Sequence, residues 1–363
     1  MTDLIIIGGF LGAGKTTLLW TLARILSQKG KRVALITNDQ ASELVDTVLL
    51  ESTGGVVKEV SGSCFCCNFN GLASAIEQSA QHADVIIAEP VGSCTDLSAT
   101  IMQPLKEKYA DVVNLRPLNV LADADKLRRL VKGESLGIHD SSRYIYRKQL
   151  EEADYIVINK TEALDEGEKA ALKADVSRYF SKKNVYLISA LLETGISEWM
   201  EPMLADQQAG IHMADVDYDI YAEGEAVLGW LNATISLNGH RTDWGVYLKN
   251  LMSALNAAFH REKMAIGHVK ALLKQENELQ VANITDTVRI KGEKIIGEEA
   301  VLTLNARVES TPGQLREIVL EAVRENCPDG ASCAILELNC LQPGRPEPTY
   351  RYNQIYRRAV PEA

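Results

Sequence analysis

Short apolar runs recur along the first 205 residues, and several are followed by a stretch whose apolar positions repeat at helical spacing. Most of these runs are rich in isoleucine, valine and leucine, which is typical of strands buried on both faces. We expect strands at residues 4–7, 32–37, 54–60, 84–88, 118–122, 154–158 and 185–188, and helices at residues 17–27, 70–80 and 143–153. Strands that alternate with helices predict a doubly wound, mostly parallel sheet of the α/β class.

The pattern changes after residue 205. Residues 206–220 are polar and predict a linker. Beyond them we expect strands at residues 225–237, 265–273, 279–284, 301–308 and 334–341, with helices at residues 244–260 and from Pro312 onward. Two helices on one face of an antiparallel sheet would make a smaller α+β domain. The expected division is therefore residues 1–205, a linker at 206–220, and residues 221–363.

The turn after the first strand carries a specific pattern: Gly9, four further residues, then Gly14-Lys15-Thr16 at the start of a helix. This spacing is that of a phosphate-binding P-loop, in which glycines let backbone N–H groups surround phosphate oxygens. Lys15 would reach the β and γ phosphates, and the Thr16 hydroxyl would bind Mg²⁺. The predicted nucleotide contacts are Gly9, Gly12, Ala13, Gly14, Lys15, Thr16 and Thr17.

Acidic residues follow two of the predicted strands, at the sheet edge where ligands bind in such folds. Glu89 ends one strand and would serve the Mg²⁺ ion, with Gly92 offering its N–H to the γ phosphate. Asp39 ends another and would face Mg²⁺ or the attacking water, although a turn-forming Asn-Asp pair explains it equally well. The predicted catalytic residues are Lys15, Thr16, Asp39 and Glu89.

A late strand ends in Asn159-Lys160-Thr161-Glu162. In a P-loop protein, Asn-Lys followed by an acid reads guanine, because the acid accepts from the ring N–H and the amino group, a pair that adenine lacks. The backbone at Ser189-Ala190, after the last strand of this unit, would contact guanine O6. A generic surface turn is the alternative for Asn159 and Lys160.

Three of the seven cysteines lie close together, at Cys64, Cys66 and Cys67. On a loop that enters a helix, their thiolates can converge on one soft divalent cation such as Zn²⁺. Three sulfurs would leave a tetrahedral site one ligand short, which suits a site that passes its metal on. The alternative is three small buried cysteines beneath a helix. The cysteines do not form a disulfide framework, so we expect reduced cytosolic thiols or metal ligands.

The net charge of −11 argues against general binding to nucleic acid or to an anionic membrane. No apolar run approaches membrane-spanning length, and the first one follows Asp3 without a basic segment, so we expect a cytoplasmic protein. The final residues, 343–352, mix proline, arginine and tyrosine, and we expect them to pack along their own domain rather than to form a partner-binding arm. His268 shares a strand face with Lys270 and is expected to be structural.

Together these motifs resemble the CobW-type metallochaperone GTPases, relatives of the urease and hydrogenase nickel-insertion GTPases. The resemblance rests on residues 8–19, the Cys64-Phe65-Cys66-Cys67 motif, Glu89-x-x-Gly92, Asn159-Lys160 and Ser189-Ala190. It implies GTP hydrolysis coupled to release of Zn²⁺, Co²⁺ or Ni²⁺ to a client metalloprotein. A homodimer is left open.

This chain departs from the family pattern at three places. Glu162 stands where the family usually has Asp, and Gln40-Ala41-Ser42 replaces the usual Glu-Phe-Gly. The histidine-rich stretch of many members is missing, so metal storage is not expected. Two competing hypotheses are a GTPase that assembles or reactivates a cofactor enzyme, such as a corrinoid enzyme, with structural cysteines, and a small-molecule kinase. The kinase hypothesis leaves the thiols and Glu162 unexplained.

Overall fold

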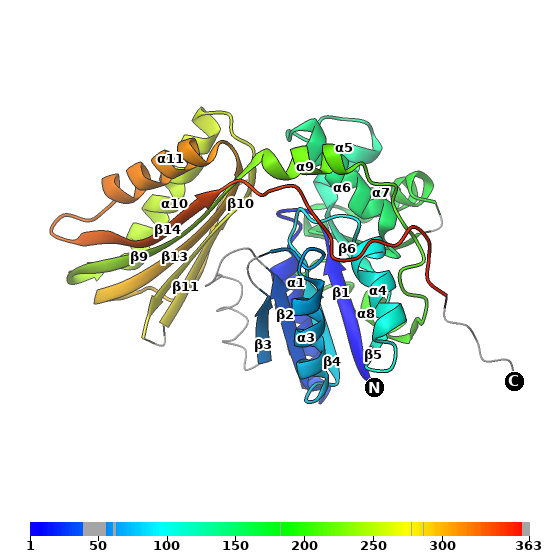
Figure 1. The fold of residues 1–363 in the computed structure, drawn as a ribbon. Helices are drawn as coiled ribbons and strands as arrows, with labels where there is room; N and C mark the ends of the chain where they lie inside the picture. The colour runs from blue at the N-terminus through cyan, green and yellow to red at the C-terminus, as the bar shows by residue number, and fades with distance from the viewer. Residues whose placement is uncertain (39–55, 61–62, 182, 277, 286, 358–363) are drawn as a thin grey trace, which may run out of the picture.

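In a computed structural model, the chain forms two lobes that are each built on a separate sheet (Figure 1). The structure describes residues 1–38, 56–60, 63–181, 183–276, 278–285 and 287–357. The first lobe holds an eight-stranded sheet in the order β3-β2-β4-β1-β6-β7-β8, and β5 also pairs with β1. The bounds are β1 (Thr2–Gly8), β2 (Val33–Asn38), β3 (Val56–Val60), β4 (Val85–Glu89), β5 (Val113–Leu115), β6 (Asn119–Asp123), β7 (Tyr155–Asn159) and β8 (Asn184–Leu187).

Every described pairing in this sheet is parallel, which confirms the predicted doubly wound sheet. The central strand β1 is apolar on both sides because helices cover both faces. Leu4 and Ile6 pack into one core, whereas Ile5 and Ile7 pack into the other. The helices are α1 (Lys15–Gln28), α3 (Phe69–Ala80), α4 (Gln103–Lys108), α5 (Ala124–Val131), α6 (Asp140–Glu152), α7 (Glu166–Tyr179) and α8 (Ile196–Ala205), with short turns η1 (Ser98–Met102) and η2 (Thr161–Ala163).

The strand order reverses direction at β1. The chain builds β2, β3 and β4 on one side of it, and then β6, β7 and β8 on the other. In open parallel sheets, ligands bind outside the carboxyl ends of the strands at such a reversal. The loop after β1 therefore lies where the topology leaves a crevice.

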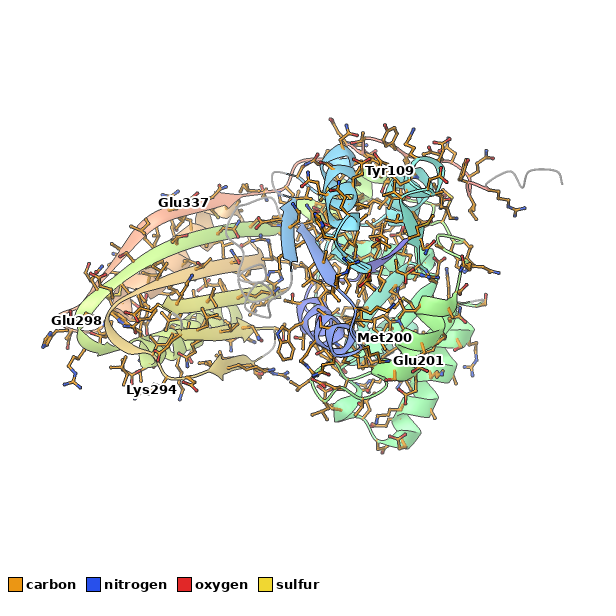
Figure 2. All side chains as sticks on the ribbon, turned by 90° about the horizontal axis from the view of Figure 1, so that it is seen from below. Tyr109, Met200, Glu201, Lys294, Glu298 and Glu337 are labelled. Carbon is orange, nitrogen blue, oxygen red and sulfur yellow. A yellow bond between two sulfur atoms is a disulfide. The ribbon has the colours of Figure 1, made fainter. Side chains whose placement is uncertain are left out.

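The second lobe holds a six-stranded antiparallel sheet in the order β12-β11-β10-β13-β9-β14. Helices α10 (Trp244–Arg261) and α11 (Pro312–Glu325) share one core with it, which confirms the predicted α+β class. In β13, Leu302, Leu304 and Ala306 alternate into this core as the sequence pattern indicated. The strand bounds are β9 (Leu228–Asp243), β10 (Ile266–Gln275), β11 (Glu278–Ile284), β12 (Val288–Gly292), β13 (Ile296–Glu309) and β14 (Ser332–Leu341). Figure 2 shows Glu298 at the end of this sheet that lies away from the first lobe.

A helix that the sequence pattern did not predict, α9 (Tyr218–Ala226), connects the lobes (Figure 1). We expected a polar linker and then a strand from residue 225. Instead, the Asp217 side chain accepts from the N–H groups of Asp219 and Ile220 and caps a helix. Tyr221 and Glu225, one helical turn apart, are buried as the helix packs on α6. The polar composition therefore belongs to the outer face of a helix.

The expectation that the C-terminal tail packs along its own domain is wrong. After β14 the chain leaves the second lobe and runs across the first (Figure 1, red). The backbone N–H of Thr349 donates to the Cys66 carbonyl at 2.8 Å, and that of Tyr352 donates to the Ala99 carbonyl at 3.1 Å. The Tyr350 ring meets Phe69 edge-on, with centroids 5.2 Å apart. This aromatic contact and the two backbone hydrogen bonds together hold the tail on the first lobe.

Two cysteines of the second lobe do not fit the expectation of reduced thiols or ligands, because Cys327 and Cys333 form a disulfide. The other five cysteines are free. Among the described residues, no helix combines the length and the apolar character that a membrane crossing requires.

Candidate functional site

The loop after β1 has the geometry of an anion cradle. Helix α1 begins at Lys15 behind Gly14, whose φ of +95° lies in the left-handed region. A Cβ atom on Gly14 would lie 2.5 Å from Asn159 Nδ2, so only glycine fits this position. The first turn of α1 contains no acidic residue, so its free N–H groups keep the positive potential that favours phosphate. Lys15 Nζ donates to the Gly9 carbonyl at 2.8 Å, and its side chain lies along the loop.

The end of β4 meets this loop from the neighbouring strand. Glu89 Oε1 lies 3.8 Å from Lys15 Nζ. A Cβ atom on Gly92 would lie 2.7 Å from Leu11 Cδ2 and 3.0 Å from Lys15 Nζ, so the segment after β4 presses against the P-loop. The structure thus brings together Lys15, Glu89 and Gly92, as the sequence predicted. Asp39 and the departure at Gln40-Ala41-Ser42 lie outside the described residues.

The end of β7 connects the P-loop to the loop after β8. Asn159 Nδ2 donates to the Ala13 carbonyl at 2.8 Å, and its Oδ1 accepts from the Ala190 N–H at 2.9 Å. Lys160, in the left-handed region with φ +65°, forms an ion pair with Asp123 at 2.7 Å.

Glu162 lies on η2 with an exposed side chain, and Ser189 precedes Ala190 at the same edge of the sheet. All the residues proposed to read the base therefore lie at one edge, and the contact with guanine stays a prediction.

The cysteine motif forms a compact turn between β3 and α3. Asn38, at the end of β2, holds it: its Oδ1 accepts from the Phe65 N–H and its Nδ2 donates to the Ser63 carbonyl, each at 2.8 Å. The sulfurs of Cys64 and Cys66 are 3.0 Å apart, and those of Cys66 and Cys67 are 3.8 Å apart. Cys64 and Cys66 are buried, whereas Cys67 is half-buried. The three thiols converge, as predicted from their spacing.

A fourth thiol that the sequence analysis missed completes the cluster. The ligand atoms of Cys64, Cys66 and Cys94 all lie within 4.8 Å of one another. Cys94 is buried and comes two residues after Gly92. A single cysteine has no ligand spacing of its own, so no motif marks it. The available signal was its position shortly after a strand-end acid, because the loops after neighbouring parallel strands meet at one edge of the sheet.

The thiols in this cluster share their protons unevenly. Hydrogen bonds from Cys66, Cys67 and Cys94 lower the pKa of Cys64. The hydrogen bond with Cys64, followed by burial, raises the pKa of Cys67 to about 11, and the same causes raise the pKa of Cys94. Without a cation, Cys66, Cys67 and Cys94 therefore resist the loss of their protons. A soft divalent ion would take the place of these protons.

The second lobe also reaches the P-loop. Lys270, on β10, donates to the Thr16 hydroxyl at 3.1 Å. A Cβ atom on Gly267 would lie 2.8 Å from Leu11 Cδ1, so the start of β10 packs directly on the loop. Burial, with the nearby charges of Lys270 and Arg307, lowers the pKa of His268. This half-buried, neutral histidine agrees with the structural role expected for it.

A family model described as the CobW/HypB/UreG nucleotide-binding domain matches residues 3–186, which is just over half of the chain. The chain belongs to the CobW/HypB/UreG family. The match covers the whole parallel sheet apart from the last residue of β8 and the first residue of β1.

Among curated proteins, the chain is 25% identical over 232 residues to a zinc chaperone CobW from Sinorhizobium, covering 56% of this chain and 65% of that protein. It is 29% identical over 181 residues to the zinc chaperone YeiR from Escherichia coli K12, covering 48% and 51%. Both matches span less than two thirds of the relative. A solved structure, the hydrogenase maturation factor HypB from Archaeoglobus fulgidus, aligns with a TM-score of 0.41 and 18% identity, covering 57% of this chain and 91% of that one.

Proposed function

We propose that this protein is a GTP-hydrolysing metallochaperone that binds a transition metal at its cysteine cluster and delivers it to a client protein. The observation that carries the proposal is that converging thiols lie on loops adjoining a P-loop, with Cys94 only two residues from Gly92. Such an arrangement lets one segment respond to both nucleotide and metal. The two curated relatives, each described as a zinc chaperone, support the same function.

The nucleotide half of the function is assigned to the P-loop and to the strand ends around it. Lys15 would neutralise charge on the transferred phosphoryl group, and backbone N–H groups from Gly9 to Thr17 would bind the remaining phosphates. The Thr16 hydroxyl and the Glu89 carboxylate are hard oxygen donors, which suit Mg²⁺. Asp39 keeps its proposed role toward Mg²⁺ or water, and residues 1–205 are the proposed GTPase unit.

The metal half is assigned to Cys64, Cys66 and Cys67, with Zn²⁺, Co²⁺ or Ni²⁺ as cargo. Three thiolates repel one another, and a divalent ion removes that repulsion while it displaces protons. Soft sulfur donors favour Zn²⁺ and its neighbours over Mg²⁺, so the two ion sites would select different metals on chemical grounds. The client would be a metalloprotein or a cofactor enzyme.

Cobalt titration of the reduced protein tests the metal half. We expect about one Co²⁺ per chain with intense thiolate-to-cobalt bands, because soft thiolate ligands suit this ion. A triple variant, Cys64→Ser with Cys66→Ser and Cys67→Ser, should lose those bands, whereas Cys340→Ser, a half-buried thiol on β14, should keep them. Equal cobalt spectra for the triple variant and the wild type would exclude the metallochaperone and favour a cofactor-assembly GTPase.

A further inference from the structure

The fourth thiol, Cys94, gives the proposed metal site a direct connection to the nucleotide site. We propose that Cys94 is a metal ligand, so that the site is a four-thiolate site whose fourth ligand belongs to the nucleotide-sensing segment. This inference rests on the proposed function. It differs from a three-thiolate site with an open position, which the sequence pattern predicted.

The sulfur positions place Cys94 among the thiols that can share one ion. With Zn–S bonds of about 2.3 Å, tetrahedral angles place neighbouring sulfurs about 3.8 Å apart. Cys66 and Cys67 already have their sulfurs 3.8 Å apart, and the sulfurs of Cys64, Cys66 and Cys94 lie within 4.8 Å of one another. Shifts of about 1 Å would therefore place Cys64, Cys66 and Cys94 around one ion. Cys67 lies outside this group of three and would complete the tetrahedron from the side of Cys66. Cys94 is 2% exposed, so solvent does not compete with it for the metal.

Cys94 is held to Gly92 by one side chain. The buried Gln149, on α6, donates through Nε2 to the Gly92 carbonyl at 3.0 Å and to the Cys94 carbonyl at 2.7 Å. Because one side-chain amide donates to both carbonyls, the segment from Gly92 to Cys94 would move as a rigid unit. Gly92 in turn presses on Lys15 of the P-loop. If a γ phosphate displaced Gly92, the Cys94 sulfur would therefore change its position as well.

The path by which metal would leave follows from burial. Cys67 is the half-buried member of the cluster, and the C-terminal tail crosses it. The backbone N–H of Glu347 donates to Cys67 Sγ at 3.3 Å, and the Thr349 hydroxyl donates to the Cys67 carbonyl at 3.0 Å. Withdrawal of the inner ligand, Cys94, would leave an ion bound by Cys64, Cys66 and Cys67. The exposed side of Cys67 is then the side on which a client could add its own ligand.

X-ray absorption at the zinc edge tests the ligand count without any variant. The reduced wild-type protein, loaded with one Zn²⁺, should show four sulfur neighbours. Three sulfurs with one oxygen or nitrogen would overturn the four-thiolate site while leaving the metallochaperone proposal intact, and the same spectrum from Cys94→Ser would then exclude Cys94 as a ligand. No sulfur neighbours would instead overturn the metallochaperone proposal itself.

Cobalt spectra of Cys94→Ser test the coupling. The change from four thiolates to three should reduce the charge-transfer intensity by about a quarter and the affinity by about tenfold or more. In the wild type, a non-hydrolysable GTP analogue should change the cobalt spectrum relative to GDP, and in Cys94→Ser that difference should disappear. Cys340→Ser is the matched control. A nucleotide-dependent difference that persists in Cys94→Ser would show that Cys94 does not transmit the signal.

An independent observation concerns the second lobe. We infer that Lys270 binds the terminal phosphate of the nucleotide. It lies on the second sheet yet donates to the Thr16 hydroxyl at 3.1 Å, an oxygen that the P-loop motif assigns to Mg²⁺. Lys15 lies along the same loop, and Lys126 Nζ is 3.8 Å from where a Cβ atom on Gly12 would lie. Positive charges from both lobes thus gather at the P-loop, and a polyphosphate is the ligand that such a cluster attracts.

Nucleotide binding by Lys270→Met tests this inference, which also rests on the proposed function. Affinity for a non-hydrolysable GTP analogue should fall about tenfold, because a charge-assisted contact is lost, while affinity for GDP changes far less. Lys274→Met, at an exposed position further along β10, should change neither. Equal losses for both nucleotides, or a rise in GTP affinity, would contradict the inference. Failure of the wild type to bind GTP would contradict the proposed function instead.

Discussion

At the scale of single residues, two side chains of the nucleotide site, Lys15 and Asn159, are hydrogen-bonded to backbone groups of the loops around it. Lys15 donates to the Gly9 carbonyl, and Asn159 spans the gap between the Ala13 carbonyl and the Ala190 N–H. These bonds fix the P-loop in a shape that already suits phosphate, so little ordering is needed when the ligand binds. The chemistry therefore depends on a few charged atoms at preset positions.

Replacement of Lys15 by alanine should reduce GTP hydrolysis at saturating GTP by about 100-fold or more. The loss of a positioned cation removes charge stabilisation on the transferred phosphoryl group. A Mg²⁺-dependent phosphate-release assay measures the rate. Lys29→Ala, at the far end of the same helix, is the matched control and should be unaffected. Undiminished hydrolysis by Lys15→Ala would remove the proposed role of the P-loop.

Replacement of Glu162 by alanine should remove the preference for GTP over ATP. The wild type should bind GTP about tenfold or more tightly than ATP, because a carboxylate that accepts two N–H groups discriminates strongly between the bases. Direct binding titrations with both nucleotides measure the ratio. Glu166→Ala, on the exposed first turn of α7, serves as the control. Equal affinities in the wild type would show that the longer side chain at position 162 does not read guanine.

At the scale of elements, the segment after β4 is anchored by neighbours that are far away in the chain. Buried Glu152, on α6, accepts from the Ser98 N–H at 2.7 Å, and burial raises the pKa of this carboxyl group. Asp96 adopts a left-handed φ of +64°, and its carboxylate receives Arg351 of the tail at 2.7 Å. A non-glycine residue in that region persists only where its surroundings enforce it. The tail is therefore part of the support for this segment.

Replacement of Arg351 by alanine should lower the free energy of unfolding by about 2 kcal/mol. The change leaves the carboxylate of Asp96, which is almost fully buried, without its cation, and the partial exposure of Arg351 keeps the loss below that of a fully buried pair. Urea unfolding measures the difference. Arg345→Ala, which breaks an exposed ion pair with Asp219, should have a much smaller effect because solvent screens that pair. Equal effects of the two changes would argue against a supporting role for the tail.

At the scale of the whole molecule, strand β9 contributes to the cores of both lobes, and the C-terminal tail of the second lobe packs on the first. The start of β9 contributes Leu228 and Trp230 to the first lobe's core, whereas Leu231 and Ala233 belong to the core of the second. Arg307, almost fully buried on β13, lies over the Trp230 ring at 4.3 Å. The tail then returns from the second lobe to the cysteine turn (Figure 1). Changes at the nucleotide site and at the metal site can therefore reach the second lobe through packed side chains.

This sharing predicts that the two lobes unfold together. Scanning calorimetry of the full chain should show a single transition, because the first lobe's core is completed by Leu228 and Trp230 of β9, a strand of the second sheet. The same experiment at saturating GDP should move that transition to a higher temperature as a whole, since the nucleotide binds only the folded state. Two resolved transitions, with GDP shifting only one of them, would show that the lobes are energetically independent.

Local patterns determined much of this protein. The apolar runs predicted the strands, because a strand buried between helices needs no polar alternation, and the P-loop glycines predicted their turn from backbone sterics alone. The convergence of Cys64, Cys66 and Cys67 also followed from spacing, since four consecutive residues cannot separate far. The doubly wound topology followed from the alternation of strands and helices.

Only the tertiary structure decided which distant residues join these motifs. Cys94 meets the other thiols because the loops after parallel strands gather at one edge of the sheet. Lys270 and Glu347 reach the P-loop and Cys67 across separations of 254 and 280 residues, with no local pattern to mark them. The sequence pattern did not reveal helix α9, because few of its residues face the core and most of its other positions are polar. In each case the deciding energy is packing between elements, which a reading of neighbouring residues along the chain does not contain.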